Sequence, residues 1–445
     1  MYPITDEEGR KLTPYTFTLT NTCTVSAAYK LNMEMLEGTT LNSKYVAVTV
    51  NNGVIKLLSS FDEATIVIDG STESRTLDTG VLSPNGSKDY SVSIWMDKSV
   101  TLEDDSQNKV FKSKIVVNAE ATETPPLDKI IASVDTTGKC PTVNDDGSVN
   151  VTAVEATNGY LCKAKDAYGN SYYYRGNVTN NYVLFADKYW RIVRINGDGT
   201  VRVIYDGTSA HANGESSDDR QIGTSAFNSS YNDNAYVGYM YGATGASTYA
   251  ETHANTNDST IKAYIDNWYK TNILGTANEQ YLADNVFCND RSLAGNNTGT
   301  GAGTSESYYR WYNGPWKSES YSKYNNKMML TCPQQNDALT VSDTTNGNGA
   351  LTYPVGLLST DEIALAGGWG EENSGYYLYS GQSWWASSLD GFHGNFARVR
   401  YVSSNGNANS SLVRRAYGVR PVFNLKADTL AQGSGTASDP YRISS

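Results

Sequence analysis

Side chains that could carry acid–base or nucleophilic chemistry are few and scattered along this chain. His211 and His253 stand in polar stretches, and His393 stands in a glycine-rich arm near the end. No Gly-x-Ser-x-Gly motif is present, and the adjacent carboxylates Glu371 and Glu372 would point in different directions. A hydrolase or a glycosidase needs a positioned nucleophile and base, or two facing carboxyl groups. We therefore interpret these residues as solvated loop positions and expect no enzymatic activity.

Oxygen ligands for a metal ion are the next chemistry to consider. Asp198 and Asp206 flank an expected hairpin, and Asp145-Asp146-Gly147 stands in a polar segment. Calcium is bound by several such oxygens, but the twelve-residue loop of an EF-hand is absent, and Asp and Gly also build ordinary turns. We prefer the turn interpretation. With no CxxC motif and no His/Cys cluster, neither a zinc site nor any cofactor is expected.

The five cysteines are an odd number, which leaves one thiol over if the others pair. Proximity along the chain favours Cys140–Cys162 and Cys288–Cys332, with Cys23 left unpaired. The alternative is five free thiols in a reducing compartment. Both interpretations stay open at this level.

Composition narrows the class of protein. The chain has 445 residues, a formal net charge of −12 and only 18% charged residues, with abundant Thr, Asn, Ser and Tyr. A nucleic-acid binder needs a basic face, so that class is excluded. The low charge and the strand-forming residues favour a β-rich secreted protein of two or three domains. The start of the chain shows neither an apolar span nor a signal peptide, so any membrane contact would need an N-terminal anchor that is missing here.

A terminal arm, Gly381 to Leu425, has a composition suited to a displayed surface. It begins with Trp384-Trp385 and closes with the apolar run Gly418 to Phe423. The tryptophans could stack on a sugar ring. Alternation along a strand more often gives such a pair one ring in the core and one at the surface. Five arginines face a single acid in this arm, so a locally basic surface for acidic ligands is expected: Arg398, Arg400, Arg414, Arg415 and Arg420 against Asp390.

The elements that must carry this arm can be placed from patterns of alternation and turn residues. Residues 1–122 predict an all-β sandwich, 123–134 a linker with a short helix from Leu127 to Val134, and 135–445 a larger α+β module. The expected strands of the first module are Thr13–Thr20, Ala27–Met35, Tyr45–Val50, Ser91–Met96 and Val110–Asn118.

In the larger module, Asn196 to Gly199 predicts a hairpin turn between Tyr189–Ile195 and Thr200–Tyr205. A helix with a core-facing stripe is expected after Asp258 or Ser259, and another is capped by Ser359-Thr360-Asp361-Glu362. We also expect a short helix over Asn278–Val286 and a strand over Leu351–Leu358. The stripe is Ile261, Tyr264, Ile265, Trp268 and Tyr269.

The first module resembles a known group of proteins through the stretches PYTFTLTNTCTVSAAYKLNMEML and LDTGVLSPNGSKDYSVSIWMD. They are similar to the immunoglobulin-like modules of Gram-positive surface and matrix proteins of the camelysin type. That resemblance implies an export segment upstream and a place at the cell surface.

The larger module resembles C-type lectin-fold proteins of bacteria and phages, including variable proteins diversified by retroelements. The resemblance lies in YWRIVRINGDGTVRVIYDG, WWASS and GVRPVFNL. It implies a binding face made by the terminal strands and loops; the calcium-dependent sugar motifs of animal lectins are absent. The implied ligand-binding positions are Asp390, Phe392, His393, Phe396, Arg398, Tyr401, Ser403, Ser410, Ser411, Leu412, Arg414 and Arg415.

One compositional feature fits diversification at adenines. An Asn codon randomised at its adenines cannot encode Trp, Lys, Glu, Gln or Met, and none of these occurs from Ala386 to Leu425. On that interpretation Asn395, Asn405, Asn407 and Asn409 are unmutated positions. A fixed Ser/Asn/Gly-rich hairpin would look the same, so both remain open.

The sequence thus predicts a non-enzymatic binding protein, extracellular, cell-surface or virion-associated, whose C-terminal lectin-like face recognises a protein or glycan partner. The alternatives are an enzyme of the formylglycine-generating or hydrolytic type and a structural filament subunit.

Overall fold

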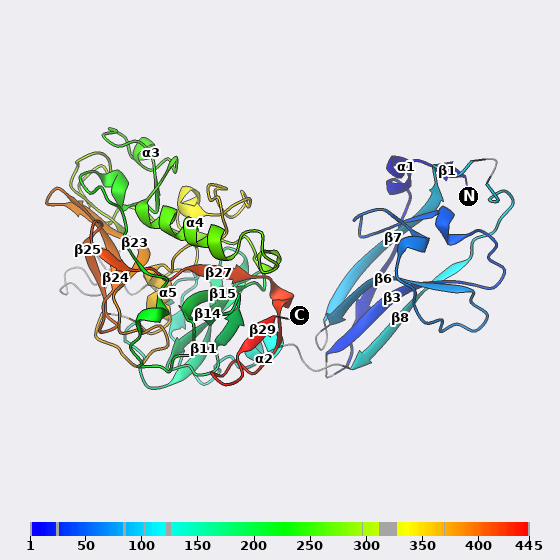
Figure 1. Cartoon of the computed structure of the whole chain (residues 1–445), viewed down its shortest axis with the longest axis horizontal. Helices are drawn as coiled ribbons and strands as arrows, with labels where there is room; N and C mark the ends of the chain where they lie inside the picture. Colours follow the sequence, from blue (N-terminus) through cyan, green and yellow to red (C-terminus); the bar gives the residue numbers. More distant parts are fainter. Residues whose placement is uncertain are drawn as a thin grey trace. The chain divides into compact units, whose positions relative to one another are not determined.

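The computed structural model describes residues 2–23, 26–82, 86–101, 104–121, 126–295, 297–310, 327–368 and 370–443. Strands hold 36% of the chain and helices 14%, so the protein is mostly β and contains several sheets. It divides into two compact units, Met1–Asp128 and Lys129–Ser445 (Figure 1). The β-rich, multidomain class is therefore confirmed. The boundary expected near residue 122 lies outside the described residues.

The first unit is built from two sheets. One has the strand order β1-β7-β4-β5, with β2 also pairing to β7, and the other has the order β6-β3-β8. The strands are β1 (Pro3–Ile4), β2 (Tyr15–Thr20), β3 (Ala27–Met35), β4 (Val46–Val50), β5 (Lys56–Leu57), β6 (Glu73–Leu82), β7 (Ser87–Asp97) and β8 (Ser113–Ala121). β8 begins and ends three residues later than the expected strand Val110–Asn118.

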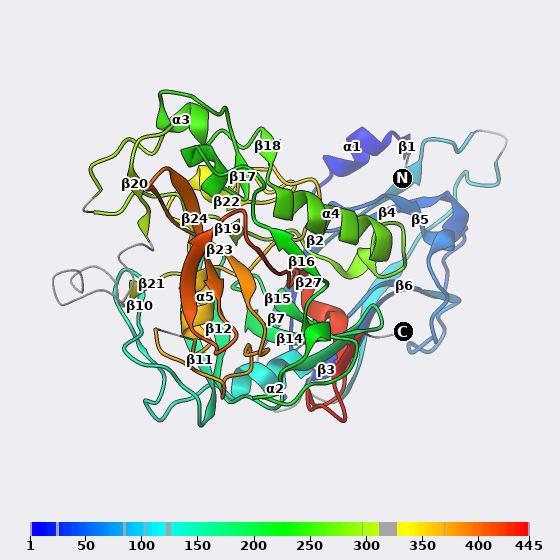
Figure 2. The ribbon, with the colours of Figure 1, turned by 60° about the vertical axis from the view of Figure 1, so that its left-hand side comes forward.

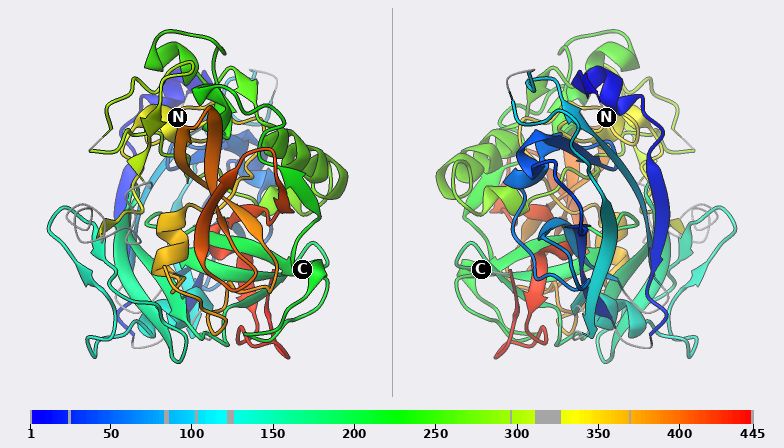
Figure 3. Two further views of the ribbon diagram at one scale, coloured as in Figure 1. Left: turned by 90° about the vertical axis from the view of Figure 1, so that its left-hand side faces the viewer. Right: turned by 90° about the vertical axis from the view of Figure 1, so that its right-hand side faces the viewer.

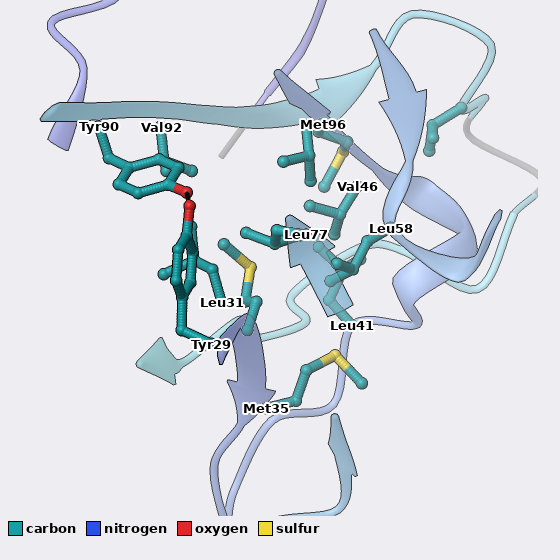
Figure 4. Packing of buried hydrophobic residues seen from close by; sticks show 13 residues of the cluster. Tyr29, Leu31, Met35, Leu41, Val46, Leu58, Leu77, Tyr90, Val92 and Met96 are labelled. Atoms are coloured by element: carbon teal, nitrogen blue, oxygen red, sulfur yellow. Dashed lines mark hydrogen bonds between the residues drawn. The ribbon is translucent and has the colours of Figure 1, made fainter. Parts of the chain in front are cut away.

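Apolar side chains from both sheets make the core of this unit. Leu31, Val46 and Leu58 are fully buried, and Figure 4 shows the Tyr29 and Tyr90 hydroxyls meeting inside it. These two oxygens are 2.7 Å apart, and the Tyr90 hydroxyl also donates to Asp78. The buried hydroxyls therefore have partners, as the low polarity of a core requires.

In the second unit the largest sheet carries the core. Its order is β11-β12-β14-β13-β29-β28, and β15 links β14 to β27. The ring centroids of Trp190 on β14 and Phe423 on β27 are 4.9 Å apart. This contact packs β27 onto the expected hairpin of β14 and β15. The strands are β11 (Gly159–Asp166), β12 (Gly169–Gly176), β13 (Tyr182–Phe185), β14 (Lys188–Ile195), β15 (Val201–Gly207), β27 (Val422–Leu425), β28 (Leu430–Gln432) and β29 (Tyr441–Ile443).

A second sheet of this unit contains the terminal arm. Its order is β16-β26-β23-β24-β25, with β20 also pairing to β23, and the left panel of Figure 3 looks onto its orange strands. The strands are β16 (Thr224–Ala226), β20 (Ser307–Tyr308), β23 (Trp384–His393), β24 (Phe396–Val402), β25 (Ala408–Leu412) and β26 (Ala416–Gly418). The described part of the unit also has one small sheet of three strands and two of two strands. They are β9 (Thr142–Val143), β10 (Val149–Asn150) and β21 (Lys327–Met328); β17 (Met240–Tyr241) and β18 (Asn257–Asp258); β19 (Phe287–Cys288) and β22 (Ala338–Leu339).

The helices are short, and two of them begin as the capping signals predict. Ser259 caps the helix Thr260–Asn272, and Ser359 with Glu362 forms a capping box at the start of the helix Thr360–Leu365. Figure 2 shows these two helices as α4 and α5. None of the helices in the described residues is long and apolar enough to cross a membrane. They are α1 (Asp6–Arg10), α2 (Pro126–Ala132), α3 (Tyr249–Thr252), α4 (Thr260–Asn272) and α5 (Thr360–Leu365).

Three sequence expectations about local structure are wrong. Asn278–Val286 forms only a single 3-10 turn, Glu279–Tyr281, rather than a helix. Leu351–Leu358 is an irregular buried segment whose sole described bridge joins Gly356 to Val422. On α4, Tyr264 is exposed, whereas its neighbours in the stripe face the core.

The cysteines pair as proximity suggested. Disulfides join Cys140 to Cys162 and Cys288 to Cys332, and Cys23 is a free, exposed thiol.

Asp206 on β15 is the centre of a buried cluster of three arginines. Its Oδ1 accepts from Arg220 Nη2 and from Arg420 Nη2, each at 2.7 Å, and its Oδ2 lies 3.8 Å from Arg191 Nη1. All four side chains are fully buried. Burial lowers the pKa of Arg420 to about 10, so the guanidinium stays charged at neutral pH. Arg420 is thus a structural residue rather than part of the expected basic surface.

We predict that Asp206→Asn destabilises the second unit by about 3–5 kcal/mol, because three buried guanidinium groups lose their carboxylate. Urea unfolding followed by tryptophan fluorescence measures the change. Asp439→Asn is the matched control, since Asp439 pairs with half-exposed Arg442 and such pairs contribute about 0–1 kcal/mol. Equal effects of the two substitutions would contradict the prediction.

His253 is a buried base that the fold keeps neutral. Its Nε2–H donates to the Gly301 carbonyl at 3.0 Å. Burial first, and the nearby charge of Arg291 second, lower the pKa of His253 from its usual 6.5 to about 3. Below pH 6.5 the imidazole of His253 therefore binds a proton in the unfolded chain but stays neutral in the folded chain.

The contribution of His253 to the free energy of unfolding is therefore complete above pH 6.5 and decreases as the pH falls toward about 3. We predict a free energy of unfolding that falls by up to about 1.4 kcal/mol per pH unit from this group alone. In His253→Gln that part of the slope is absent, while the side-chain amide can still donate to Gly301. Urea titrations of both proteins between pH 7 and pH 4 test this; parallel slopes would contradict it.

Candidate functional site

Alternation along β24 and β25 divides the candidate residues between two faces of the sheet. Arg398 pairs with Leu412 and Arg400 with Ser410, whereas Val399 pairs with Ser411 between them. Successive side chains on a strand point to opposite faces. The candidates therefore form two groups rather than one continuous surface.

We call the first group the arginine face. It comprises Asp390, His393, Phe396, Arg398, Arg400, Ser410, Leu412 and Arg414.

Asp390 is the buried centre of the arginine face. Its Oδ1 lies 2.6 Å from Arg400 Nη2, and its Oδ2 lies 3.5 Å from His393 Nε2 and 3.9 Å from Arg398 Nε. Burial opposes ionisation of this carboxyl, but the charge of Arg400 and hydrogen bonds from His393 and Ser410 outweigh it. The pKa of Asp390 is therefore held below its usual value. The carboxylate fixes the surrounding cations and is not itself available to a ligand.

Arg414 lies at one end of this face on a pair of aromatic rings. Tyr231 and Phe396 are stacked with 5.5 Å between centroids. The Arg414 guanidinium lies 4.5 Å from the Tyr231 ring centroid and 5.6 Å from that of Phe396. Stacking of this kind restrains a long side chain while leaving its N–H groups free to bind.

The opposite face holds a second aromatic group, made by Tyr401, Tyr417 and Trp385. The tyrosine rings are stacked at 4.4 Å, and Trp385 packs against both from the core side. The Ser411 hydroxyl lies 3.2 Å from the Tyr417 hydroxyl. Only the outer part of this group is accessible, since Trp385 is fully buried.

Several predicted site residues are placed differently from the expectation. Asp390 and Phe392 are buried, at 3% and 1% exposure, so they do not contact a ligand at the surface. Trp384 and Trp385 are both buried, which excludes a sugar-stacking ring from that pair and corrects the expectation of one surface tryptophan. The locally basic surface is also smaller than expected, because Arg400 and Arg420 are buried.

The other predicted positions are at least partly exposed. Arg414 and Arg415 are the most open of them, and Ser403 lies in the turn between β24 and β25. The partly exposed set is His393, Phe396, Arg398, Tyr401, Ser403, Ser410, Ser411 and Leu412. Arg398, Arg414 and Arg415 are therefore the exposed cations of the arm.

Sequence reasoning missed two aromatic residues of this region. Tyr231 comes from the segment 206–257, which has no periodicity, and Tyr417 comes from β26. No local pattern distinguishes them from the other tyrosines. Only the tertiary arrangement brings them to the terminal strands.

The acidic turn residues act structurally, as preferred from the sequence. Asp198 accepts from the Thr200 backbone N–H and hydroxyl, and Asp146 accepts from those of Ser148. Within the described residues, no group of three or more His, Cys, Asp or Glu side chains is arranged to hold a metal ion.

Comparison with known proteins gives one match. A family described as "Domain of unknown function (DUF6273)" matches residues 307–427, which cover β20, α5 and the strands β23 to β27. No curated protein matches the chain. No solved structure matches it either.

The burial of Phe392 on β23 can be tested directly. We predict that Phe392→Ala lowers the free energy of unfolding by about 3–5 kcal/mol, as expected for an aromatic ring removed from a core. Arg415→Ala, at an exposed position in the turn between β25 and β26, should change it by less than about 0.5 kcal/mol. Thermal unfolding of both variants checks the contrast, and a stable Phe392→Ala protein would refute the assigned face.

Proposed function

We propose that this chain is a non-enzymatic binding protein displayed outside the cell or on a virion. In this proposal the first unit is an immunoglobulin-like module, and the second is a C-type lectin-like domain that recognises a protein or glycan partner. The observation that carries it is the β24–β25 hairpin. Its exposed arginine, aromatic, Ser and Asn side chains stand on strands whose neighbours are held by buried ion pairs.

That combination has the properties of a paratope. Aromatic and arginine side chains supply contact area, small polar residues supply adaptable hydrogen bonds, and a rigid frame limits the entropy lost on binding. Arg420, in the segment before β27, is buried and does not contribute to the surface. It donates to the Tyr205 and Leu378 carbonyls and to Asp206, and so fixes the backbone beneath the hairpin.

An extracellular place is supported by the two disulfides, because such bonds persist in oxidising compartments. Retroelement diversification of residues 386–425 remains part of the proposal. The encoding DNA tests it: a nearby near-copy of that segment, differing at adenines and accompanied by a reverse-transcriptase gene, is expected.

The binding role is tested with arrays of glycans and displayed peptides probed with the full chain. We predict that Phe396→Ala, Leu412→Ala and Arg415→Ala together weaken binding to any ligand found by at least about tenfold. Lys163→Ala with Lys165→Ala is the control, since both lysines are exposed on β11 in another sheet. Circular dichroism verifies that both proteins remain folded.

Two outcomes would favour the alternatives. Turnover of a peptidoglycan or glycan substrate would indicate an enzyme, and concentration-dependent filaments in light scattering would indicate a structural subunit. If the triple variant keeps its binding and the β11 control loses it, the ligand site lies outside the β24–β25 hairpin.

A further inference from the structure

β25 is a free edge of its sheet. It pairs with β24 on one side, and in the described part of the chain no strand pairs with its other side (Figure 1). Its sequence, Ala-Asn-Ser-Ser-Leu, contains no Lys or Pro, and its pairing with β24 has no bulge. Natural edges are usually protected by such devices. β25 lacks them.

The backbone of this edge is oriented to receive another strand. The Ser410 N–H donates to the side chain of its own neighbour, Asn409, at 2.8 Å, so it points away from β24. Because backbone groups alternate in direction along a strand, the N–H of Leu412 points the same way. The outer side of β25 therefore offers donors at alternate residues, one of them covered only by the exposed Asn409 amide.

Two arginines with unused donors lie next to this edge on the arginine face. In the described residues neither Arg398 nor Arg414 donates a hydrogen bond. Arg398 Nε lies 3.9 Å from Asp390 Oδ2, which is too far for a hydrogen bond, and the Arg414 guanidinium is stacked on the Tyr231 ring. Arg398 pairs with Leu412. Arg414 lies in the turn after β25, where the Val413 N–H still donates to the Ala397 carbonyl, and its guanidinium lies over the Phe396 ring on the same face. The backbone positions of Arg398 and Arg414, as diagonal neighbours, are about 7–8 Å apart.

That spacing fits the geometry of an extended peptide. Alternate side chains of a strand lie on one face about 6.8 Å apart. A strand added to β25 would be about 9.6 Å from β24, two strand spacings, so a long acidic side chain must reach toward Arg398. Glutamate meets this requirement better than aspartate. The sole acid of the arm, Asp390, is already committed to Arg400.

We propose that β25 accepts an extended acidic segment of a partner protein as an additional strand. Glutamates at alternate positions of that segment bind Arg398 and Arg414, and its backbone pairs with Ser410 and Leu412. This proposal rests on the binding function proposed above and specifies its partner. Main-chain pairing supplies affinity, and the arginine pair supplies the preference for acidic sequences.

The test uses two short peptides of the same composition, one alternating threonine and glutamate, the other with the glutamates contiguous. Fluorescence anisotropy with the full chain should show the alternating peptide binding at least about fivefold more tightly. Arg398→Gln and Arg414→Gln should each weaken it several-fold, and raised salt should weaken it further. Lys163→Gln, an equal charge change at an exposed position of β11 in another sheet, should have less than a twofold effect.

Ser410→Pro tests the main-chain pairing separately. Proline is tolerated on edge strands where the N–H faces outward, so the fold should survive, but the donor is lost. Ser410→Ala is the matched control, because it removes the hydroxyl and keeps the N–H. We expect binding to be lost in the proline variant and retained in the alanine variant.

Equal affinity for the two peptides, no binding of either, or equal binding by the proline and alanine variants would overturn the proposal. An acidic oligosaccharide that needs both arginines but ignores Ser410→Pro would overturn strand addition while leaving the binding function standing. If the full chain binds nothing on the glycan and peptide arrays, the proposed binding function itself is wrong.

Discussion

The second unit depends on one aspartate surrounded by three arginines. Asp206 connects β15 to Arg191 on β14, to Arg220 in a 3-10 turn and to Arg420 before β27. The cluster carries two more positive than negative charges, which burial alone would make unfavourable. Backbone carbonyls and aromatic rings offset the excess: Arg420 lies 5.1 Å from the Trp384 ring centroid, and Arg191 lies 3.8 Å from that of Tyr182. The start of β23 is thus anchored to the core through Arg420.

A second ion cluster joins α5 to the large sheet. Glu362 completes the capping box of α5 and also binds Arg194 and Arg202. Burial raises its pKa, but the two guanidinium charges outweigh this and lower it, so the carboxylate stays ionised. The helix α5 and the large sheet are therefore joined through charged groups whose partners are specific. Such connections favour a single arrangement of the strands, which a binding surface on their edge requires.

The parts of this structure that the sequence predicted are those encoded in contiguous residues. Asn196 to Gly199 fixes a hairpin and Ser259 begins α4, because turn and cap chemistry act within a few residues. The burial of Phe392 could not be foreseen. It depends on the face that β23 turns toward β24, and the register of that pair shifts between Leu389 and Gly391. The partner of Arg420, 214 residues earlier in the chain, is equally invisible to local patterns.

Asn409 gives the free edge a reversible cover. Its amide oxygen occupies the outward N–H of Ser410, so an isolated molecule presents a satisfied group rather than an open template. A single side-chain rotation releases that donor when another strand arrives. The same asparagine thus satisfies one outward donor in the free protein and would yield that donor to a partner strand.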